Sequence, residues 1–178
     1  NHPEREDGII SGAQDSIGIC VPGLCRHYYD NHFWPERIET CEDEAVLQWL
    51  ENHLCMIPME PRCPGCSVVE GQDITKEKVE ALAAAADRCW NAIMTMDLEA
   101  FATAYKDSFH AQVAMFPAMI QGSVSSYIEK YSAQDEVLAW KMPGAGGGGY
   151  LACVVTDTGS FCAAHPEAIA LRIRRSGM

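Results

Sequence analysis

The sequence has few basic residues and lacks a long apolar run. Its 178 residues include 13 Lys and Arg against 25 Asp and Glu, which gives a formal net charge of −12. Such a charge disfavours a nucleic-acid backbone or an anionic membrane as the main partner. No apolar run reaches the roughly 18 residues needed to span a bilayer. We therefore expect neither a nucleic-acid-binding protein nor a membrane protein.

The first residues also lack an initiator methionine and the layout of a secretory signal. Residues 1–7 are polar and acidic instead of basic and then apolar. We therefore expect a cytoplasmic protein whose chain was processed or begins inside a longer one. The composition, with 48% hydrophobic and 21% charged residues, is that of a globular chain. The length suits one domain, or one domain and part of another.

The cysteines are numerous but have no framework spacing. The sequence contains nine, an odd number, and without a secretory signal most of them are expected to be reduced thiols. The one tight pair is Cys63 and Cys66. A structural zinc site usually needs a second pair of ligands at matching spacing, so no metal site is predicted. The role of this pair is left open.

Apolar periodicity and capping residues predict a segregated order of helices and strands. Ser11 is expected to cap the first helix, Thr40 the second, Thr75 the third and Asp97 the fourth. The expected helices cover residues 12–20, 41–53, 76–96, 98–116 and 123–131, and residues 159–166 form a truncated helix or a loop. The expected strands cover residues 24–30, 33–39, 54–59, 137–142, 150–156 and 168–174. This order favours an α+β fold with an antiparallel sheet.

A glycine-rich loop is the most prominent motif. Residues 143–149 read Pro-Gly-Ala-Gly-Gly-Gly-Gly, between two expected strands. Such a loop has no side-chain bulk and exposes backbone amides that can bind phosphate or a sugar. A Walker loop would require Lys-Ser or Lys-Thr and then a helix, whereas Tyr150 and Leu151 follow here. The alternative is a flexible hairpin connection.

Lys141 to Leu151 resembles the third conserved motif of the GHMP kinases, the superfamily of galactose, homoserine, mevalonate and phosphomevalonate kinases. Residues 168–174 resemble the last strand of its sugar-kinase branch. Residues 11–18, followed by Pro22-Gly23-Leu24, are similar to the segment that carries the catalytic aspartate in that branch. The nearest resemblance is to the fucose, galactose and heptose kinases, and it covers essentially the whole chain as a C-terminal half.

The resemblance implies a division of the chain and an activity. Residues 1–40 would be the tail of an N-terminal catalytic domain of the ribosomal S5 domain 2 type, and residues 41–178 a ferredoxin-like C-terminal domain. The complete enzyme would use ATP and Mg²⁺ to phosphorylate a monosaccharide hydroxyl. Asp15 would be the catalytic residue. The substrate or phosphate would be bound by Gly144, Ala145, Gly146, Gly147, Gly148, Gly149 and Lys141.

Some of these residues also have a simpler interpretation. A lone strand lysine such as Lys141 usually faces solvent, and Asp15 could be an ordinary helix-start charge. Arg62, in the loop after an expected strand, is expected to be a solvated arginine. His110 is expected to pack near the apolar face of its helix.

The nucleotide loop of the family, a Pro-x-x-x-Gly-Leu-Ser-Ser-Ser-like stretch, is not present in residues 1–12. The chain alone is therefore expected to be inactive, to bind no cofactor and to need a missing N-terminal half or a separate chain. The alternative is a non-catalytic sugar-binding, sensing or dimerisation module with the same fold. Aromatic residues between positions 28 and 34 predict a homo-oligomer. The sugar and its reacting hydroxyl are not determined.

Overall fold

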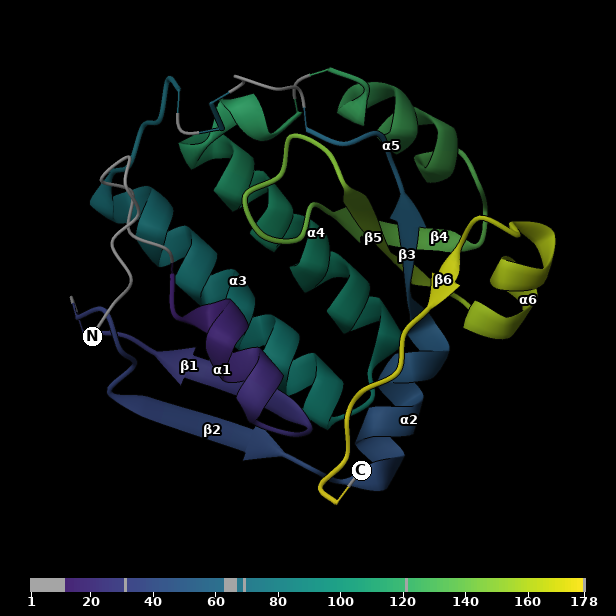
Figure 1. Cartoon of the computed structure of the whole chain (residues 1–178), viewed down its shortest axis with the longest axis horizontal. Helices are drawn as coiled ribbons and strands as arrows, with labels where there is room; N and C mark the ends of the chain where they lie inside the picture. The colour runs from purple at the N-terminus through teal and green to yellow at the C-terminus, as the bar shows by residue number, and fades with distance from the viewer. Residues whose placement is uncertain (1–11, 31, 63–66, 69, 121, 178) are drawn as a thin grey trace. The chain divides into compact units, whose positions relative to one another are not determined.

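The computed structural model describes residues 12–30, 32–62, 67–68, 70–120 and 122–177 (Figure 1). The expected cap Ser11 and the pair Cys63 and Cys66 lie outside these residues. The chain has two compact units: the first unit comprises residues 1–47 and 172–178, and the second unit comprises residues 48–171. Helix α2 (Glu44–His53) continues from one unit into the other. The boundary near residue 40 stays a prediction.

The first unit contains a short helix and a hairpin. Helix α1 (Gln14–Cys20) begins after Ala13, which gives no side-chain cap. Strands β1 (Leu24–Tyr28) and β2 (Arg37–Cys41) pair antiparallel. Gly23 follows the helix with a φ of +73°, and a Cβ atom there would lie 2.3 Å from the carbonyl oxygen of Cys41. The predicted helix stop at Pro22-Gly23 therefore also lets the chain pass close to β2.

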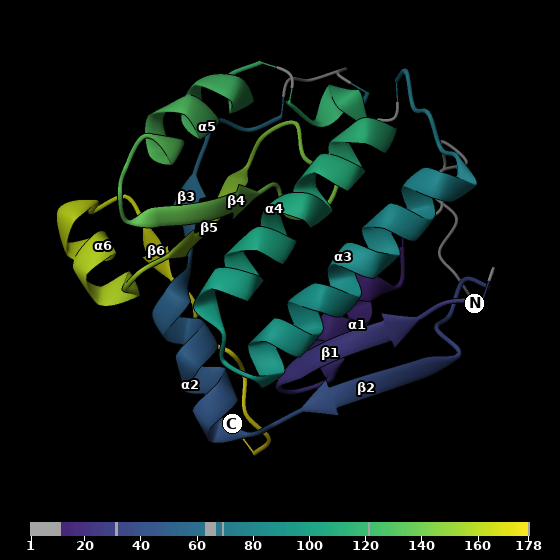
Figure 2. The same cartoon turned by 180° about the vertical axis from the view of Figure 1, so that it is seen from behind.

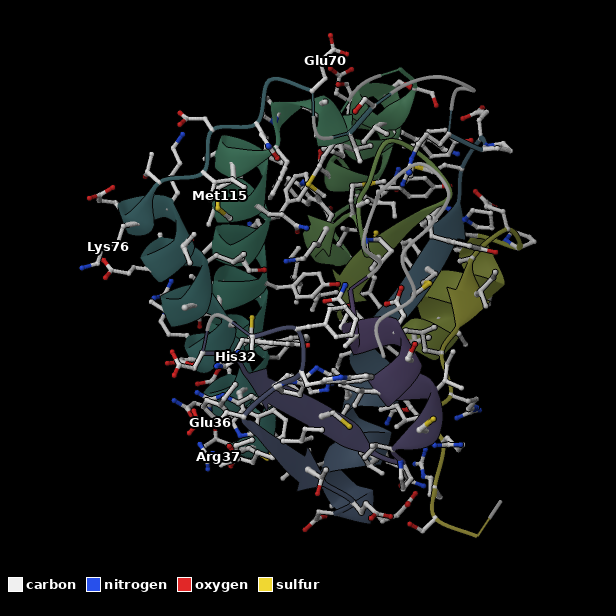
Figure 3. The ribbon with its side chains drawn as sticks, turned by 60° about the vertical axis from the view of Figure 1, so that its left-hand side comes forward. His32, Glu36, Arg37, Glu70, Lys76 and Met115 are labelled. Carbon is white, nitrogen blue, oxygen red and sulfur yellow. The ribbon has the colours of Figure 1, made fainter. Side chains whose placement is uncertain are left out.

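The second strand and the next helix start later than the sequence predicted. Strand β2 begins at Arg37, near Glu36 in Figure 3. Phe33 and Trp34, expected in the strand, lie in the preceding turn, where their rings meet edge to face with centroids 5.0 Å apart. Thr40 belongs to β2 and does not cap α2. The cap is Asp43, whose Oδ1 accepts the amide of Ala45 at 2.9 Å.

The second unit is built on one antiparallel sheet. Its strands are β3 (Leu54–Pro58), β4 (Val137–Lys141), β5 (Tyr150–Val155) and β6 (Ile169–Ala170), in the order β4-β5-β3-β6. Between β3 and β4 lie α3 (Lys76–Met94), α4 (Leu98–Met115), the 3₁₀ helix η1 (Pro117–Ile120) and α5 (Val124–Ser132). Helix α6 (Thr158–Ala164) separates β5 from β6. This β-α-β-β-α-β succession is ferredoxin-like, and it confirms the predicted α+β class.

Side-chain caps set the starts of three helices. Thr75 Oγ1 accepts the amide of Lys78, and Asp97 Oδ1 accepts that of Ala100 at 3.0 Å. Asp157 caps α6 in the same way. The expected caps Thr75 and Asp97 are therefore confirmed. Helices α3 and α4 lie side by side (Figure 2), and Lys76 in the first turn of α3 extends away from the helix (Figure 3).

The buried side of α3 differs from the expected one. The sequence predicted a face with Val79, Leu82, Ala83, Ala86, Trp90 and Ile93. Val79 is 47% exposed, whereas the buried residues of the helix are Ala85 and Ala92. Small side chains allow two helix backbones to approach closely. Alanines occur all round this helix, so apolar spacing did not identify the side that packs.

The core of the second unit lies between the sheet and its helices. Helices α4 and α5 pack against β4, and α6 packs against β6 (Figure 1). Buried residues of β3, β4, β5, α4, η1, α5 and α6, with two methionines just after β3 and β4, form one cluster: Cys55, Ile57, Met59, Phe109, Met119, Val124, Tyr131, Val137, Met142, Leu151, Cys153, Val155 and Phe161.

The last strand is shorter than predicted. Strand β6 covers Ile169–Ala170 instead of residues 168–174. From Arg172 onward the chain belongs to the first unit, where the carbonyl of Arg174 accepts the amide of Gly23 at 2.8 Å. Arg175 forms an ion pair of 2.8 Å with Glu44. These contacts replace the expected continuation of the sheet.

Candidate functional site

The glycine loop connects β4 to β5 and has a left-handed backbone over most of its length. The φ angles are +64° at Gly144, +74° at Gly146, +77° at Gly147, +144° at Gly148 and +92° at Gly149. Residues with a Cβ atom rarely adopt these angles. The run of glycine is therefore required by the path of the loop.

The loop also packs tightly against the segment that follows β3. A Cβ atom on Gly148 would lie 2.7 Å from the carbonyl oxygen of Glu60 and 2.8 Å from the amide nitrogen of Arg62. A Cβ atom on Gly146 would lie 2.9 Å from the side chain of Met119. Two of the glycines thus admit close contact with other parts of the second unit.

Hydrogen bonds fix the loop in this position. The amide of Gly147 donates to the carbonyl of Met119 at 2.8 Å, and that of Gly149 to the carbonyl of Glu60 at 2.9 Å. The carbonyl of Gly146 accepts two bonds from the Arg62 guanidinium, at 3.1 Å from Nε and 2.8 Å from Nη2. The loop is thus held at several points, and the alternative of a flexible hairpin connection stays a prediction.

Other amides of the loop are not used within the described chain. Those of Ala145, Gly146 and Gly148 donate to no acceptor among the described residues. Successive free amides in a loop with left-handed residues can bind the oxygens of an anion. The loop can therefore offer backbone donors to a phosphate or a hydroxyl oxygen.

Glu60, whose carbonyl accepts the amide of Gly149, also has a carboxylate that binds two hydroxyl groups. The Glu60 carboxylate accepts the hydroxyl of Ser123 at 2.7 Å and that of Tyr127 at 3.4 Å. The Ser123 hydrogen bond lowers the pKa of Glu60, so this side chain is ionised at neutral pH. The segment around Glu60 thus combines a negative charge with the Arg62 cation.

Three residues make contacts that the sequence did not indicate. Arg62 is exposed, as expected of a loop arginine, but its guanidinium also binds the Gly146 carbonyl. Gln112 on α4 donates to the Gly144 carbonyl at 3.1 Å, and nothing in the local sequence indicated this. Nothing in the sequence indicated that Glu60 would contact the loop either. His110, expected to be packed, is exposed.

Lys141 is half-buried at the end of β4 and does not face solvent freely. Its Nζ lies 3.0 Å from the Oγ of Ser108, a buried residue of α4. Burial lowers the pKa of Lys141. The side chain is therefore engaged with α4, one turn before the Gln112 contact to the loop. Its role as a phosphate ligand stays a prediction.

Asp15 lies in the first turn of α1 and is exposed. The positive end of a helix dipole favours a carboxylate at this position. Asp15 belongs to the first unit, whereas Lys141 and the glycine loop belong to the second. Within the second unit the structure brings Lys141 and the loop together through α4. The catalytic role of Asp15 stays a prediction.

The described residues contain no group of three His, Cys, Asp or Glu side chains that could hold a metal ion. In the same part of the chain, no helix has both the length and the apolar character needed to cross a bilayer.

The fold of this chain was compared with known proteins. Comparison with protein-family models and with curated protein sequences gives no match. The chain is similar to the crystal structure of a proposed sugar kinase from Campylobacter jejuni, with a TM-score of 0.61 and 19% sequence identity. The match covers 97% of this chain and 52% of that protein, so the chain spans about half its length. The chain therefore has a sugar-kinase-like fold.

Proposed function

We propose that this chain is the C-terminal half of a GHMP-type sugar kinase, which transfers a phosphoryl group from ATP to a monosaccharide hydroxyl. The observation that carries the proposal is the glycine loop, which is anchored on both sides and leaves the amides of Ala145, Gly146 and Gly148 free for an anion. The shared fold with a proposed sugar kinase supports it. The activity is proposed for a complete protein of about twice this length.

Each predicted site residue has a role in this proposal. Asp15 orients the sugar hydroxyl and accepts its proton, which makes the oxygen a better nucleophile. Gly144 to Gly149 donate amide hydrogen bonds to phosphoryl or sugar oxygens. Lys141 supplies positive charge at the base of the loop.

The resemblance implies ATP and Mg²⁺, and this chain offers donors for the first but no assigned ligands for the second. The free loop amides match the oxygens of the ATP phosphates, which supply the transferred group. No Mg²⁺ ligand is assigned here, because the described residues hold no suitable cluster of three side chains. Residues 1–40 would form the end of the N-terminal catalytic domain. The remainder of that domain would come from a longer chain or from a separate polypeptide.

The test measures ADP release by two purified proteins. One is the 178-residue chain, and the other is the same chain extended by the residues that the upstream coding region encodes. Each is incubated with Mg·ATP and a panel of monosaccharides. We expect sugar-dependent ADP release from the longer protein only. The short chain should not bind Mg·ATP tightly enough to give a calorimetric signal, because it offers the phosphates only the loop amides. Sugar binding without ADP release from the longer protein would instead identify the sensing module.

A further inference from the structure

One peptide group in the glycine loop is held at both of its polar ends. Its carbonyl, from Gly146, accepts two hydrogen bonds from the Arg62 guanidinium. Its amide, from Gly147, donates to the carbonyl of Met119 at 2.8 Å. The carbonyl and amide of a trans peptide point in opposite directions. Arg62 and Met119 together therefore set the orientation of this peptide plane.

The peptides two positions away on either side, 144–145 and 148–149, are held at one end each. Gln112 binds the carbonyl of Gly144, and the carbonyl of Glu60 accepts the amide of Gly149. Between these anchors the amides of Ala145, Gly146 and Gly148 have no acceptor among the described residues. Gly146 is a buried residue, and a buried amide without an acceptor is costly unless a ligand or water binds it.

We propose that Arg62 is a positioning residue, which orients the loop peptides so that their free amides form a binding site for a phosphoryl group. This inference rests on the proposed function and adds a residue that acts on the phosphate through the backbone. Both guanidinium nitrogens that contact the loop are bonded to the Gly146 carbonyl. The backbone of residue 62 also lies against Gly148.

The fork geometry of arginine is central to this role. A guanidinium can place two N–H donors on one oxygen and hold it in a fixed direction, whereas a lysine is a flexible point charge. Glycine peptides have little rotational preference of their own. Without the fork, the peptide between Gly146 and Gly147 loses one of its two anchors, and the adjacent amides lose their common orientation.

The test is a titration of the ¹⁵N-labelled 178-residue chain with inorganic pyrophosphate, followed through its amide signals. In the parent protein we expect the signals of Ala145, Gly146 and Gly148 to shift most. Those of Gly147 and Gly149 should shift less, because they already donate to protein carbonyls. Arg62→Ala and Arg62→Lys should both weaken pyrophosphate binding by about tenfold or more, the scale of a lost charge-assisted hydrogen bond.

The matched control is Arg88→Ala, which removes the same charge from the surface of α3, where Arg88 pairs with Asp107. It should bind pyrophosphate like the parent. Amide signals outside the loop report the fold of each variant. If Arg62→Ala does not fold, Arg62→Lys and Arg62→Gln make the comparison.

The outcomes separate this inference from the function on which it rests. If Arg62→Lys binds like the parent and only the neutral variants fail, Arg62 acts through its charge and the positioning role is wrong. Unchanged binding in every Arg62 variant overturns the role as well. If the parent chain itself shows no loop shifts, the phosphate site of the proposed function is wrong, and this inference falls with it.

Discussion

At the residue scale, the glycines of the loop are not equivalent. Gly148 combines a φ of +144° with a close approach to the backbone atoms of Glu60 and Arg62. Gly144 has a φ of +64°, and a Cβ atom there would meet nothing within 4 Å. A side chain at position 148 is therefore disfavoured by both the backbone torsion and the lack of space. At position 144 it is disfavoured by the torsion alone.

Gly148→Ala should accordingly destabilise the protein more than Gly144→Ala. We expect a loss of about 2–4 kcal/mol for Gly148→Ala, because strained backbone and a steric conflict add together. For Gly144→Ala the left-handed conformation alone should cost about 1–2 kcal/mol. Urea unfolding of both variants measures the difference. Equal losses would show that the loop moves away from residue 60 to accept the methyl group.

Asp15 is the residue on which the proposed chemistry depends most. In the complete enzyme, Asp15→Asn should lower kcat by about 10²–10⁴-fold and change sugar affinity little, because a general base acts in the transition state. Steady-state kinetics measure this, with Asp30→Asn as a control carboxylate of the first unit. Circular dichroism reports the fold. A kcat within about threefold of the parent would leave Asp15 as a helix-start charge only, below the usual contribution of a general base.

At the element scale, α5 and the segment after α6 are joined through a buried tyrosine. Tyr131 is 1% exposed as a residue, and its hydroxyl donates to the Glu167 carboxylate at 2.6 Å. Lys130 Nζ lies 3.5 Å from the same carboxylate. The Tyr131 hydrogen bond is the main reason that the pKa of Glu167 falls from its ordinary 4.5 to about 2, and the Lys130 charge adds to it.

This link predicts a specific acid sensitivity. Because the folded protein favours the ionised carboxylate, Glu167 stabilises it above pH 4.5, and this contribution is lost as the pH falls toward 2. Glu167→Gln should therefore flatten the decline of unfolding free energy between pH 4.5 and pH 2. Urea unfolding across this range measures the slope. Glu70→Gln, at an exposed position in the loop after β3 (Figure 3), should keep the parent slope; an unchanged slope in Glu167→Gln would contradict the link.

Helix α4 connects the helical layer to the glycine loop. Its Ser108 lies beside the Lys141 amine, and its Gln112, one turn later, binds the carbonyl of Gly144. Residues four apart lie on the same side of a helix. The helix thus anchors both the strand that enters the loop and the first glycine of the loop.

At the scale of the whole molecule, the first unit exposes an apolar groove of about 400 Å³. It is lined by Ser16, Ile17, Cys20, Val21, Trp34, Pro35 and Ile38. Trp34 is 51% exposed, and Ile19 on the neighbouring helix is 73% exposed. A two-stranded sheet such as β1–β2 is marginal without further packing. We propose that this groove mediates the homo-oligomer expected from the sequence.

Trp34→Ser should therefore shift the 178-residue chain toward a monomer. Burial of a tryptophan in an interface contributes on the order of 2–4 kcal/mol, enough to change a dimer equilibrium by tenfold or more. Analytical ultracentrifugation over a range of concentrations measures it. Ile74→Ser is the control, since Ile74 is 55% exposed in the second unit. A parent chain that is monomeric at high concentration would contradict the proposal.

The sequence by itself determined the features that depend on neighbouring residues. Thr75 and Asp97 were recognised as caps because a cap binds an amide three residues away. The hairpin around the glycine loop and the α+β order followed from apolar patterns and turn residues. The prediction that Thr40 caps α2 was wrong, because the strand extends to Cys41 and Asp43, three positions later, caps the helix instead.

Only the tertiary structure decided the features that depend on distant residues. Arg62 and Gly146 are 84 positions apart, and no local pattern indicates that one binds the other. The end of β6 depends on contacts that the residues from Arg172 onward make within the first unit. The buried side of α3 depends on how the helix packs against α4. A hydrogen bond or a packed surface requires both partners to be positioned. Composition and periodicity describe each segment alone, so they left these pairings undetermined.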